Sequence, residues 1–199
     1  MALATYADLQ TQVANWLHRS DLTTYIPDFI TLFEAAAARR MKVRAQQTTV
    51  SLTTSGGSVA LPSDYLGWQR LTWIGSPVTD LTYAHPSVLK TYYPTSPAGI
   101  PQMFTIESGN IKIMPTDDTG LELVYFKKTA ALSTALNWLY TNHPDAYLFG
   151  TLCEAQGFNV APDKLAMWKA RRDEVFDEIR VQNFREPGNL SIRVIGYTP

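Results

Sequence analysis

The residue types that most often perform acid–base or nucleophilic chemistry are scarce in this sequence. Its three histidines, His18, His85 and His143, lie far apart, and none has a second metal ligand or an orienting carboxylate at a useful spacing. His143 precedes Pro144, a pair typical of a turn or of a helix N-terminus. The single cysteine, Cys153, falls beside the apolar face of a predicted helix and lacks a motif that would activate a thiol. We therefore expect turn-forming histidines and a buried structural cysteine.

Motifs that bind phosphate, metal or acyl groups are also missing. The sequence contains no Walker phosphate loop, no dinucleotide-binding glycine pattern, no nucleophile elbow and no paired cysteine or histidine metal motif. Asp117 and Asp118 lack the oxygen spacing of a calcium loop, which indicates a β-turn. The doublets Arg39–Arg40 and Arg171–Arg172 are interpreted as solvated helix faces rather than as phosphate clamps. The sequence thus predicts no enzyme, no cofactor and no metal site.

Composition narrows the class of protein further. Hydrophobic residues make up 45% of the 199 residues and charged residues 18%, which suits one domain or one compact body with an inserted lobe. The formal net charge of -1 predicts no general attraction to nucleic acid or to anionic lipid. No segment approaches the roughly 20 apolar residues that span a bilayer. The start of the chain lacks the pattern of a signal peptide, and we expect no membrane partner.

Helical patterns occupy the two ends of the sequence. Thr5 and Asp8 have the spacing of a capping box, and an apolar stripe follows at helical intervals. A second helix is predicted from Pro27 to the basic residues near position 40, where positive charge favours a helix C-terminus. Two further helices are predicted over residues 144–158 and 162–184, and their short connection favours antiparallel packing.

The central part, from about residue 43 to residue 129, is typical of β-structure. Short alternating segments surround Gly56–Gly57 and Ser108–Gly109, which predicts two hairpins, and residues 121–126 predict another strand. One short helix is predicted over residues 86–92. The expected fold is α+β: a bundle of about four helices with an inserted antiparallel β lobe and an extended C-terminal arm. The expected parts are residues 1–42, 43–130, 131–186 and 187–199.

Two features of the C-terminal part indicate contacts with other chains. The predicted helix over residues 162–184 has balanced acidic and basic residues on its outer face. Residues 191–195 (SIRVI) can form a strand but have no hairpin partner in the sequence. Such a strand must pair with an edge in its own lobe or on another chain.

Aromatic residues allow two interpretations of the β lobe. Trp68, Trp73, Tyr92 and Tyr93 belong to the core if they are buried. If they are exposed together on one face, they favour a binding module that recognises another protein or a glycan.

Four stretches, in this order along the chain, resemble the tailed-phage head-to-tail adaptors (connectors), the group that includes the tail tubular A-type proteins. They are residues 28–40, residues 61–66 (LPSDYL) with Arg70 and Leu71, residues 99–115, and residues 137–155 with the segments NWL and PDAYLFG. Phe104 stands where the family pattern usually has tyrosine.

The resemblance implies a non-enzymatic virion protein of the neck, assembled in the host cytoplasm. It implies a dodecameric ring of copies that joins the portal protein to a tail or nozzle protein, with double-stranded DNA passing through without sequence-specific binding. The portal-docking arm is predicted to use Ile192, Arg193, Val194, Ile195 and Tyr197. The subunit–subunit interface is predicted to use Arg171, Arg172, Asp173, Glu174, Asp177, Glu178 and Arg180.

An alternative function is that of another neck or tail-completion protein whose β lobe recognises a tail protein or glycan. A second alternative, an enzyme, would need a cluster of carboxylates or histidines in one pocket.

Overall fold

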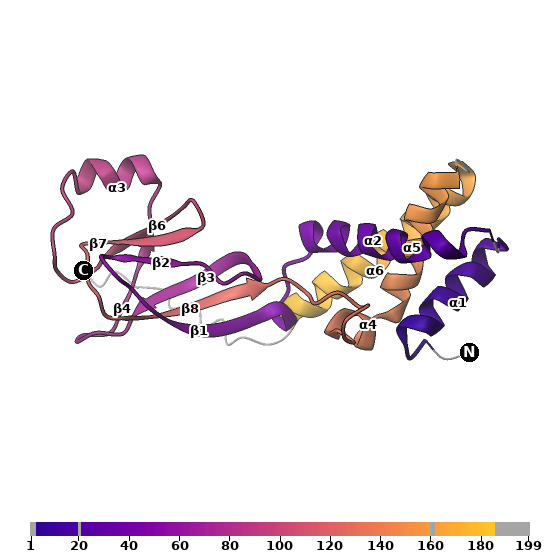
Figure 1. Cartoon of the computed structure of the whole chain (residues 1–199), viewed down its shortest axis with the longest axis horizontal. Helices are drawn as coiled ribbons and strands as arrows, with labels where there is room; N and C mark the ends of the chain where they lie inside the picture. Colours follow the sequence, from indigo (N-terminus) through magenta and orange to yellow (C-terminus); the bar gives the residue numbers. More distant parts are fainter. Residues whose placement is uncertain (1–2, 20, 160–161, 186–199) are drawn as a thin grey trace, which may run out of the picture. The chain divides into compact units, whose positions relative to one another are not determined.

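The computed structural model describes residues 3–19, 21–159 and 162–185. The chain forms two compact units, a helical unit from residues 1–43 and 130–199 and a β unit from residues 44–129 (Figure 1). The predicted α+β class is confirmed. The predicted four-part division stays a prediction, because its arm over residues 187–199 lies outside the described residues.

The helical unit begins with the predicted capping box. Thr5 Oγ1 accepts a hydrogen bond from the Asp8 backbone N–H at 3.1 Å, and the Asp8 carboxylate accepts one from the Thr5 N–H at 2.9 Å. These two bonds satisfy donors that the first turn of a helix leaves free. The helices of this unit are α1 (Tyr6–Leu17), α2 (Ile26–Arg40), α4 (Trp138–Asn142), α5 (Pro144–Asn159) and α6 (Pro162–Arg185), with a short 3₁₀ turn over Thr23–Tyr25 before α2.

Helix α4 was not predicted, because its five residues are too short to show a helical repeat of apolar positions. Asn137 starts it by accepting a hydrogen bond from the Tyr140 N–H at 3.0 Å. The Asn137 side chain therefore acts as the N-cap of α4.

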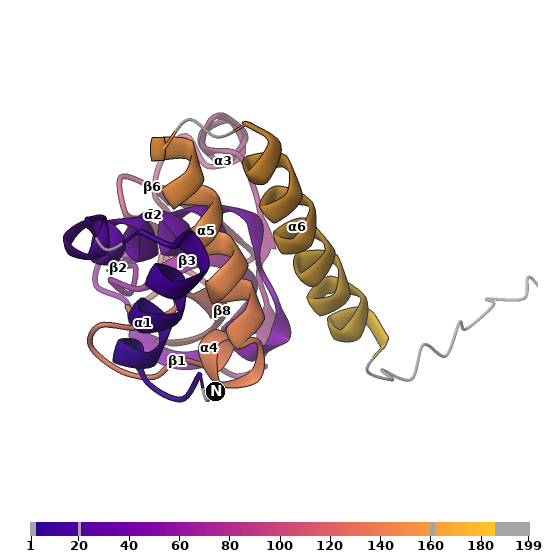
Figure 2. The ribbon, with the colours of Figure 1, turned by 90° about the vertical axis from the view of Figure 1, so that its right-hand side faces the viewer.

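Helix α5 contacts α1, α2, α4 and α6, and Figure 2 shows it between α1 and α6. It packs closely against α2 at Gly150, where an added Cβ would lie 2.0 Å from Cδ2 of Phe33. Phe33 is fully buried and also packs edge-on against Tyr147, with ring centroids 5.0 Å apart. Only glycine at position 150 allows the two helices to pack this closely.

A polar network fixes the chain where it returns to the helical unit. One carboxylate oxygen of Glu34 accepts hydrogen bonds from the Leu132 N–H at 2.7 Å and from the Tyr147 hydroxyl at 3.0 Å. The Asn137 amide donates to the Tyr147 oxygen at 2.7 Å and to the Ala130 carbonyl at 2.8 Å. Burial raises the pKa of Tyr147 well above its ordinary value, so the hydroxyl stays protonated and donates to Glu34.

The β unit contains two four-stranded sheets, ordered β1-β8-β3-β4 and β2-β7-β6-β5. The strands are β1 (Gln47–Thr53), β2 (Ser58–Ala60), β3 (Tyr65–Trp73), β4 (Thr79–Asp80), β5 (Thr82–Tyr83), β6 (Met103–Glu107), β7 (Asn110–Met114) and β8 (Gly120–Lys127). A 3₁₀ turn over Arg44–Gln46 precedes them, and α3 (Pro86–Tyr92) is the predicted short helix. All pairings are antiparallel except that of β5 with β6, which is parallel.

Of the two predicted hairpins, one is confirmed and one is wrong. Strands β6 and β7 pair directly across Ser108 and Gly109, which adopt φ angles of 52° and 75°. At the other position, Ser55 and Ser58 form a tight turn, but β1 pairs with β8 and β2 pairs with β7. The local turn chemistry was recognised correctly. The strands on either side belong to different sheets because their partners lie far along the chain.

The segment LPSDY joins the start of β3 to the end of β8. The Asp64 carboxylate accepts a hydrogen bond from the Tyr125 hydroxyl at 2.8 Å, and the Asp64 carbonyl accepts one from the Lys128 N–H at 2.6 Å. The Tyr65 ring stacks on Tyr125 with centroids 6.0 Å apart. Burial, together with the hydrogen bond and the charge of Asp64, raises the pKa of Tyr125 from 10.0 to about 12.

Replacing Tyr125→Phe tests this contact. The variant loses the hydrogen bond to Asp64 and should lose about 1 kcal/mol of unfolding free energy at neutral pH. Because the pKa of Tyr125 is raised by folding, its contribution is complete below pH 10.0 and is lost as the pH rises through about 12. Urea unfolding at about pH 8 and about pH 11 should therefore show a smaller pH-dependent loss in the variant than in the original protein. Equal losses in the two proteins would contradict the assignment.

Candidate functional site

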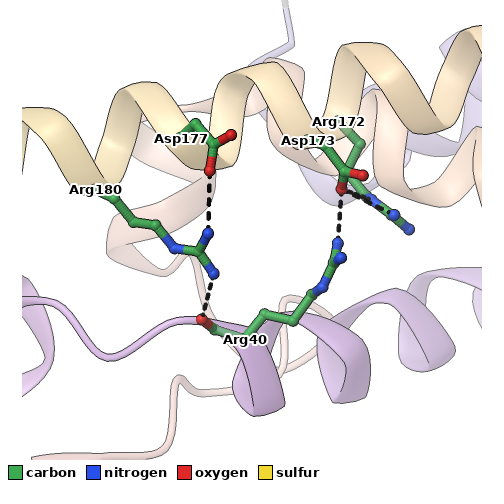
Figure 3. Close-up of polar contacts among 5 residues, drawn as sticks. All are labelled: Arg40, Arg172, Asp173, Asp177 and Arg180. Atoms are coloured by element: carbon green, nitrogen blue, oxygen red, sulfur yellow. Dashed lines mark hydrogen bonds and ion pairs between the residues drawn. The ribbon is translucent and has the colours of Figure 1, made fainter.

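Within the described residues of the helical unit, a group of charged contacts joins α6 to the end of α2. Arg40, the last residue of α2, donates a hydrogen bond from Nη1 to Asp173 Oδ1 at 2.6 Å. Arg172 donates to the same oxygen through Nε at 3.1 Å and Nη2 at 2.9 Å (Figure 3). Burial alone would raise the pKa of Asp173, but the hydrogen bonds from Arg40 and Arg172 outweigh it and hold that pKa below its ordinary value.

Arg180 completes this group, which we name the Arg40 cluster: Arg40, Arg172, Asp173, Asp177 and Arg180. The Arg180 guanidinium donates to the Arg40 carbonyl and to the Asp177 carboxylate, each at 3.0 Å (Figure 3). A cation bonded to the last carbonyl of a helix satisfies an acceptor and opposes the negative end of the helix dipole. The cluster therefore fixes the C-terminal end of α2 against α6.

A hollow of about 180 Å³ lies in this cluster, lined by Arg40, Asp173, Phe176, Asp177 and Arg180. The Arg40 guanidinium also lies over the Phe176 ring, 5.9 Å from its centroid. The charges in the hollow are already paired with one another, so its chemistry is that of a helix–helix contact.

The seven predicted interface residues fall into two groups. Arg172 is buried and, with Asp173, makes contacts inside the subunit. The other five, which are Arg171, Glu174, Asp177, Glu178 and Arg180, are exposed. Two ion pairs link members of this exposed group along the helix, Arg171 with Glu174 at 3.3 Å and Arg180 with Asp177 at 3.0 Å. Their contact with a second copy stays a prediction.

The middle part of α6 has its charges ordered along the helix axis. From position 164 to position 178 every cation precedes every anion, in the order Lys164, Lys169, Arg171, Arg172, Asp173, Glu174, Asp177 and Glu178. The helix dipole favours the opposite order, with anions toward the N-terminus and cations toward the C-terminus. This effect is confined to the first and last turns, where Asp163 and Arg185 have the favourable signs, so the dipole does not explain the order of the charges between them.

The other candidate residues have local structural roles. His18 ends α1 with a left-handed backbone, His85 caps α3 by accepting the Ser87 N–H, and His143 follows α4. Cys153 is buried, and burial is the main cause that raises its pKa to about 11.

Within residues 3–19, 21–159 and 162–185, no group of three histidine, cysteine or acidic side chains could hold a metal ion. No helix in that same part of the chain is long and apolar enough to cross a membrane.

The predicted turn at Asp117 and Asp118 is a point where several loops of the β unit meet. The Asp117 carboxylate accepts a hydrogen bond from Trp73 Nε1 at 2.7 Å, and its carbonyl accepts one from the Thr54 hydroxyl at 2.6 Å. Asp118 accepts the Gly57 N–H at 3.3 Å. Hydrogen bonds from Thr119 and Trp73 hold the pKa of Asp117 below its ordinary value, so the carboxylate has a structural role.

The aromatic residues of the β unit are divided between core and surface. Trp73 is buried, whereas Tyr92 is 67% exposed. Trp68 is 39% exposed and stacks on Tyr83, with centroids 5.6 Å apart and Tyr83 41% exposed. Sequence reasoning missed Tyr83, because a two-residue strand leaves almost no periodic signal. It also missed the contact of Arg40 with Asp173, since the two lie 133 positions apart.

Comparison with known proteins identifies one family that matches almost the whole chain. The model of one family, SU10 adaptor protein, matches residues 4–193. No curated protein matches the chain. The predicted arm residues Ile192, Arg193, Val194, Ile195 and Tyr197 lie outside the residues that the structure describes.

The Arg40 cluster predicts unequal effects for two neighbouring aspartates. Asp173→Ala leaves the buried Arg172 guanidinium without its acceptor and should lower the unfolding free energy by about 1–2 kcal/mol. Asp177→Ala removes only an exposed pair and should change it by less than about 0.5 kcal/mol. Urea unfolding of both variants measures the difference, and equal effects would show that Asp173 has no special role.

Proposed function

The chain belongs to the SU10 adaptor protein family, a family of phage head-to-tail adaptors, and we propose that copies of it form a dodecameric ring that joins the portal to the tail. The observation that carries this proposal is the family match over residues 4–193. In the proposed ring, double-stranded DNA passes through the channel without sequence-specific binding.

Family membership places the protein in a structural class. Adaptors of this kind are structural components of the virion neck, and membership implies interaction with portal and tail proteins. Assembly in the host cytoplasm, before or during tail attachment, is part of the proposal.

The order of charges on α6 supports self-assembly. A closed ring of identical copies uses heterologous contacts, so each copy must present two different and complementary surfaces. Helix α6 has a cationic stretch that ends at Arg172 and an anionic stretch that begins at Asp173. In the proposal, exposed Glu174 and Glu178 of one copy lie against exposed Lys169 and Arg171 of the next.

The net charge of the chain supports the passage of DNA. A strongly basic channel binds phosphates and releases counterions, which slows the sliding of DNA. A formal net charge of -1 gives the subunit no general affinity of that kind.

The arm over residues 187–199 is proposed to dock on the portal through Ile192, Arg193, Val194, Ile195 and Tyr197. Its apolar and β-branched residues suit pairing with a strand edge. The division of the chain into helical core, β lobe and arm belongs to the same proposal.

The alternative function, recognition of a tail protein or glycan by the β unit, has one observation in its favour. Trp68 and Tyr83 stack on each other while each remains about two-fifths exposed. Stacked aromatic side chains with an exposed face are frequent in recognition surfaces. This surface is compatible with the adaptor role, in which the β unit contacts a tail protein.

Truncation tests the adaptor role and its arm together. Full-length protein and a form ending at Pro187 are each mixed separately with the cognate portal ring. Mass photometry then measures the mass of each complex. We expect about a dozen full-length copies on each portal and none of the truncated form. If neither form binds the portal, the adaptor assignment fails and the β unit becomes the place to search for a ligand.

Charge reversal tests the α6 interface. Glu174→Lys combined with Glu178→Lys should abolish ring assembly on the portal, because like charges then face each other across the interface. Adding Lys169→Glu and Arg171→Glu to the same chain should restore assembly, since the complementarity returns with both signs exchanged. Glu122→Lys, a reversal of a half-exposed carboxylate that pairs with Arg70 within the β unit, is the control. Normal assembly of the first variant would rule out this interface.

A further inference from the structure

Strand β1 (Gln47–Thr53) forms one edge of its sheet and pairs with β8 along its whole length. The pairing is regular, from Gln47 opposite Phe126 to Thr53 opposite Gly120. In the part of the chain that the structure describes, the other three edge strands are much shorter: β2 has three residues, and β4 and β5 have two each. The seven-residue β1 is therefore the one long edge of the described β unit.

This edge lacks the features that usually prevent strand addition. Proteins protect edge strands with charged residues, prolines, bulges or a very short length. The sequence of β1, QTTVSLT, contains no charged residue and no proline, and its register with β8 has no shift. Among the described strands, only β8 pairs with β1, so the backbone N–H and C=O groups on its outer side could pair with an added strand, as in recognition by β-augmentation.

The side chains of β1 show which residues an added strand needs. Val50 and Leu52 are only partly buried at the margin of the β core, whereas Thr49, Ser51 and Thr53 are exposed on the other face. An added strand with apolar residues two positions apart would extend the core over Val50 and Leu52. Its intervening residues would continue the exposed face.

Residues 191–195 (SIRVI) have this pattern, and they lie outside the described residues. Ile192 and Val194 are two positions apart and would lie on the core side, while Ser191, Arg193 and Ile195 would lie on the outer side. Residues 186–190, which follow the end of α6, supply a reach of about 17 Å at roughly 3.4 Å per residue. The segment is thus long enough to extend away from its own helix.

We propose that β1 of one copy binds residues 191–195 of a neighbouring copy as an added strand. This inference rests on the proposed ring, in which every copy must offer two unlike and complementary surfaces. The donor strand and the acceptor edge form such a pair. The added strand keeps its second edge and the side chains of Arg193 and Ile195 for the portal, whereas Ile192 and Val194 would bind the neighbouring copy instead.

Disulfide trapping tests the pairing in the assembled complex. Arg193→Cys is combined in turn with Thr49→Cys, Ser51→Cys or Thr53→Cys. These three positions are exposed and two residues apart, so they test each register in which Arg193 would lie on the outer face. Each full-length variant is assembled on the cognate portal, oxidised mildly and separated on a denaturing, non-reducing gel. Residues opposite each other on paired strands lie about 5 Å apart, within the roughly 7 Å that a disulfide allows between Cα atoms.

The matched control combines Arg193→Cys with Glu122→Cys. Glu122 lies on β8, opposite Ser51 and on the same face, but one strand further from the edge. It would be about 10 Å from the added strand, which is beyond the reach of a disulfide. The natural Cys153 is buried with a raised pKa and is common to all variants.

A ladder of disulfide-linked multimers from at least one β1 position, and none from position 122, supports the inference. Rings that assemble normally without such a ladder overturn it and leave the adaptor function intact. A cross-linked product with the mass of a single chain also overturns it, because the strand then pairs within its own copy. If no ring forms on the portal, the proposed function has failed and the inference falls with it.

Discussion

The helical unit depends on a carboxylate, Glu34, that two distant parts of the chain share. One of its oxygens accepts both the Leu132 N–H and the Tyr147 hydroxyl, and Asn137 joins the same network. In a poorly solvated site such a network is stable only when all of its members are satisfied. The position of the returning chain is therefore fixed before α5 begins at Pro144. This brings Gly150 of α5 against Phe33 of α2. Loss of any one partner would leave polar groups of the others unpaired in the core.

The Arg40 cluster has a related role at the other end of α2. Exposed ion pairs contribute little to stability, but here Arg172 is buried and shares Asp173 with Arg40. The cluster combines a helix cap, a cation over an aromatic ring and a shared carboxylate. It uses Arg172 and Asp173 within the subunit, and the more exposed charges of α6 are those proposed to contact a neighbouring copy. A single helix can therefore contribute to the core of its subunit and still leave charged side chains on the surface.

The sequence predicted what depends on local patterns. The capping box at Thr5, the helices at both ends and the hairpin at Ser108–Gly109 all follow from periodicity and turn chemistry, and the structure has them. The family was also recognised from the order of four motifs, and residues 4–193 match its model. The pairing of β1 with β8 and the contact of Arg40 with Asp173 could not be read in this way. Both join residues far apart in sequence, and many other pairings of the same residues would satisfy the same local rules.

The first and last long strands of the β unit, β1 and β8, are paired neighbours, with Gln47 opposite Phe126 (Figure 1). The chain thus enters and leaves this unit at adjacent positions. In the helical unit both connections lie close to α2: one leaves just after Arg40, and the returning chain is hydrogen-bonded to Glu34 through the Leu132 N–H. Glu34 and Arg40 are six residues apart, about 9 Å along the helix. Such an arrangement is that of a tolerated domain insertion, so a different domain with closely spaced ends could be grafted there while the helical core remained unchanged.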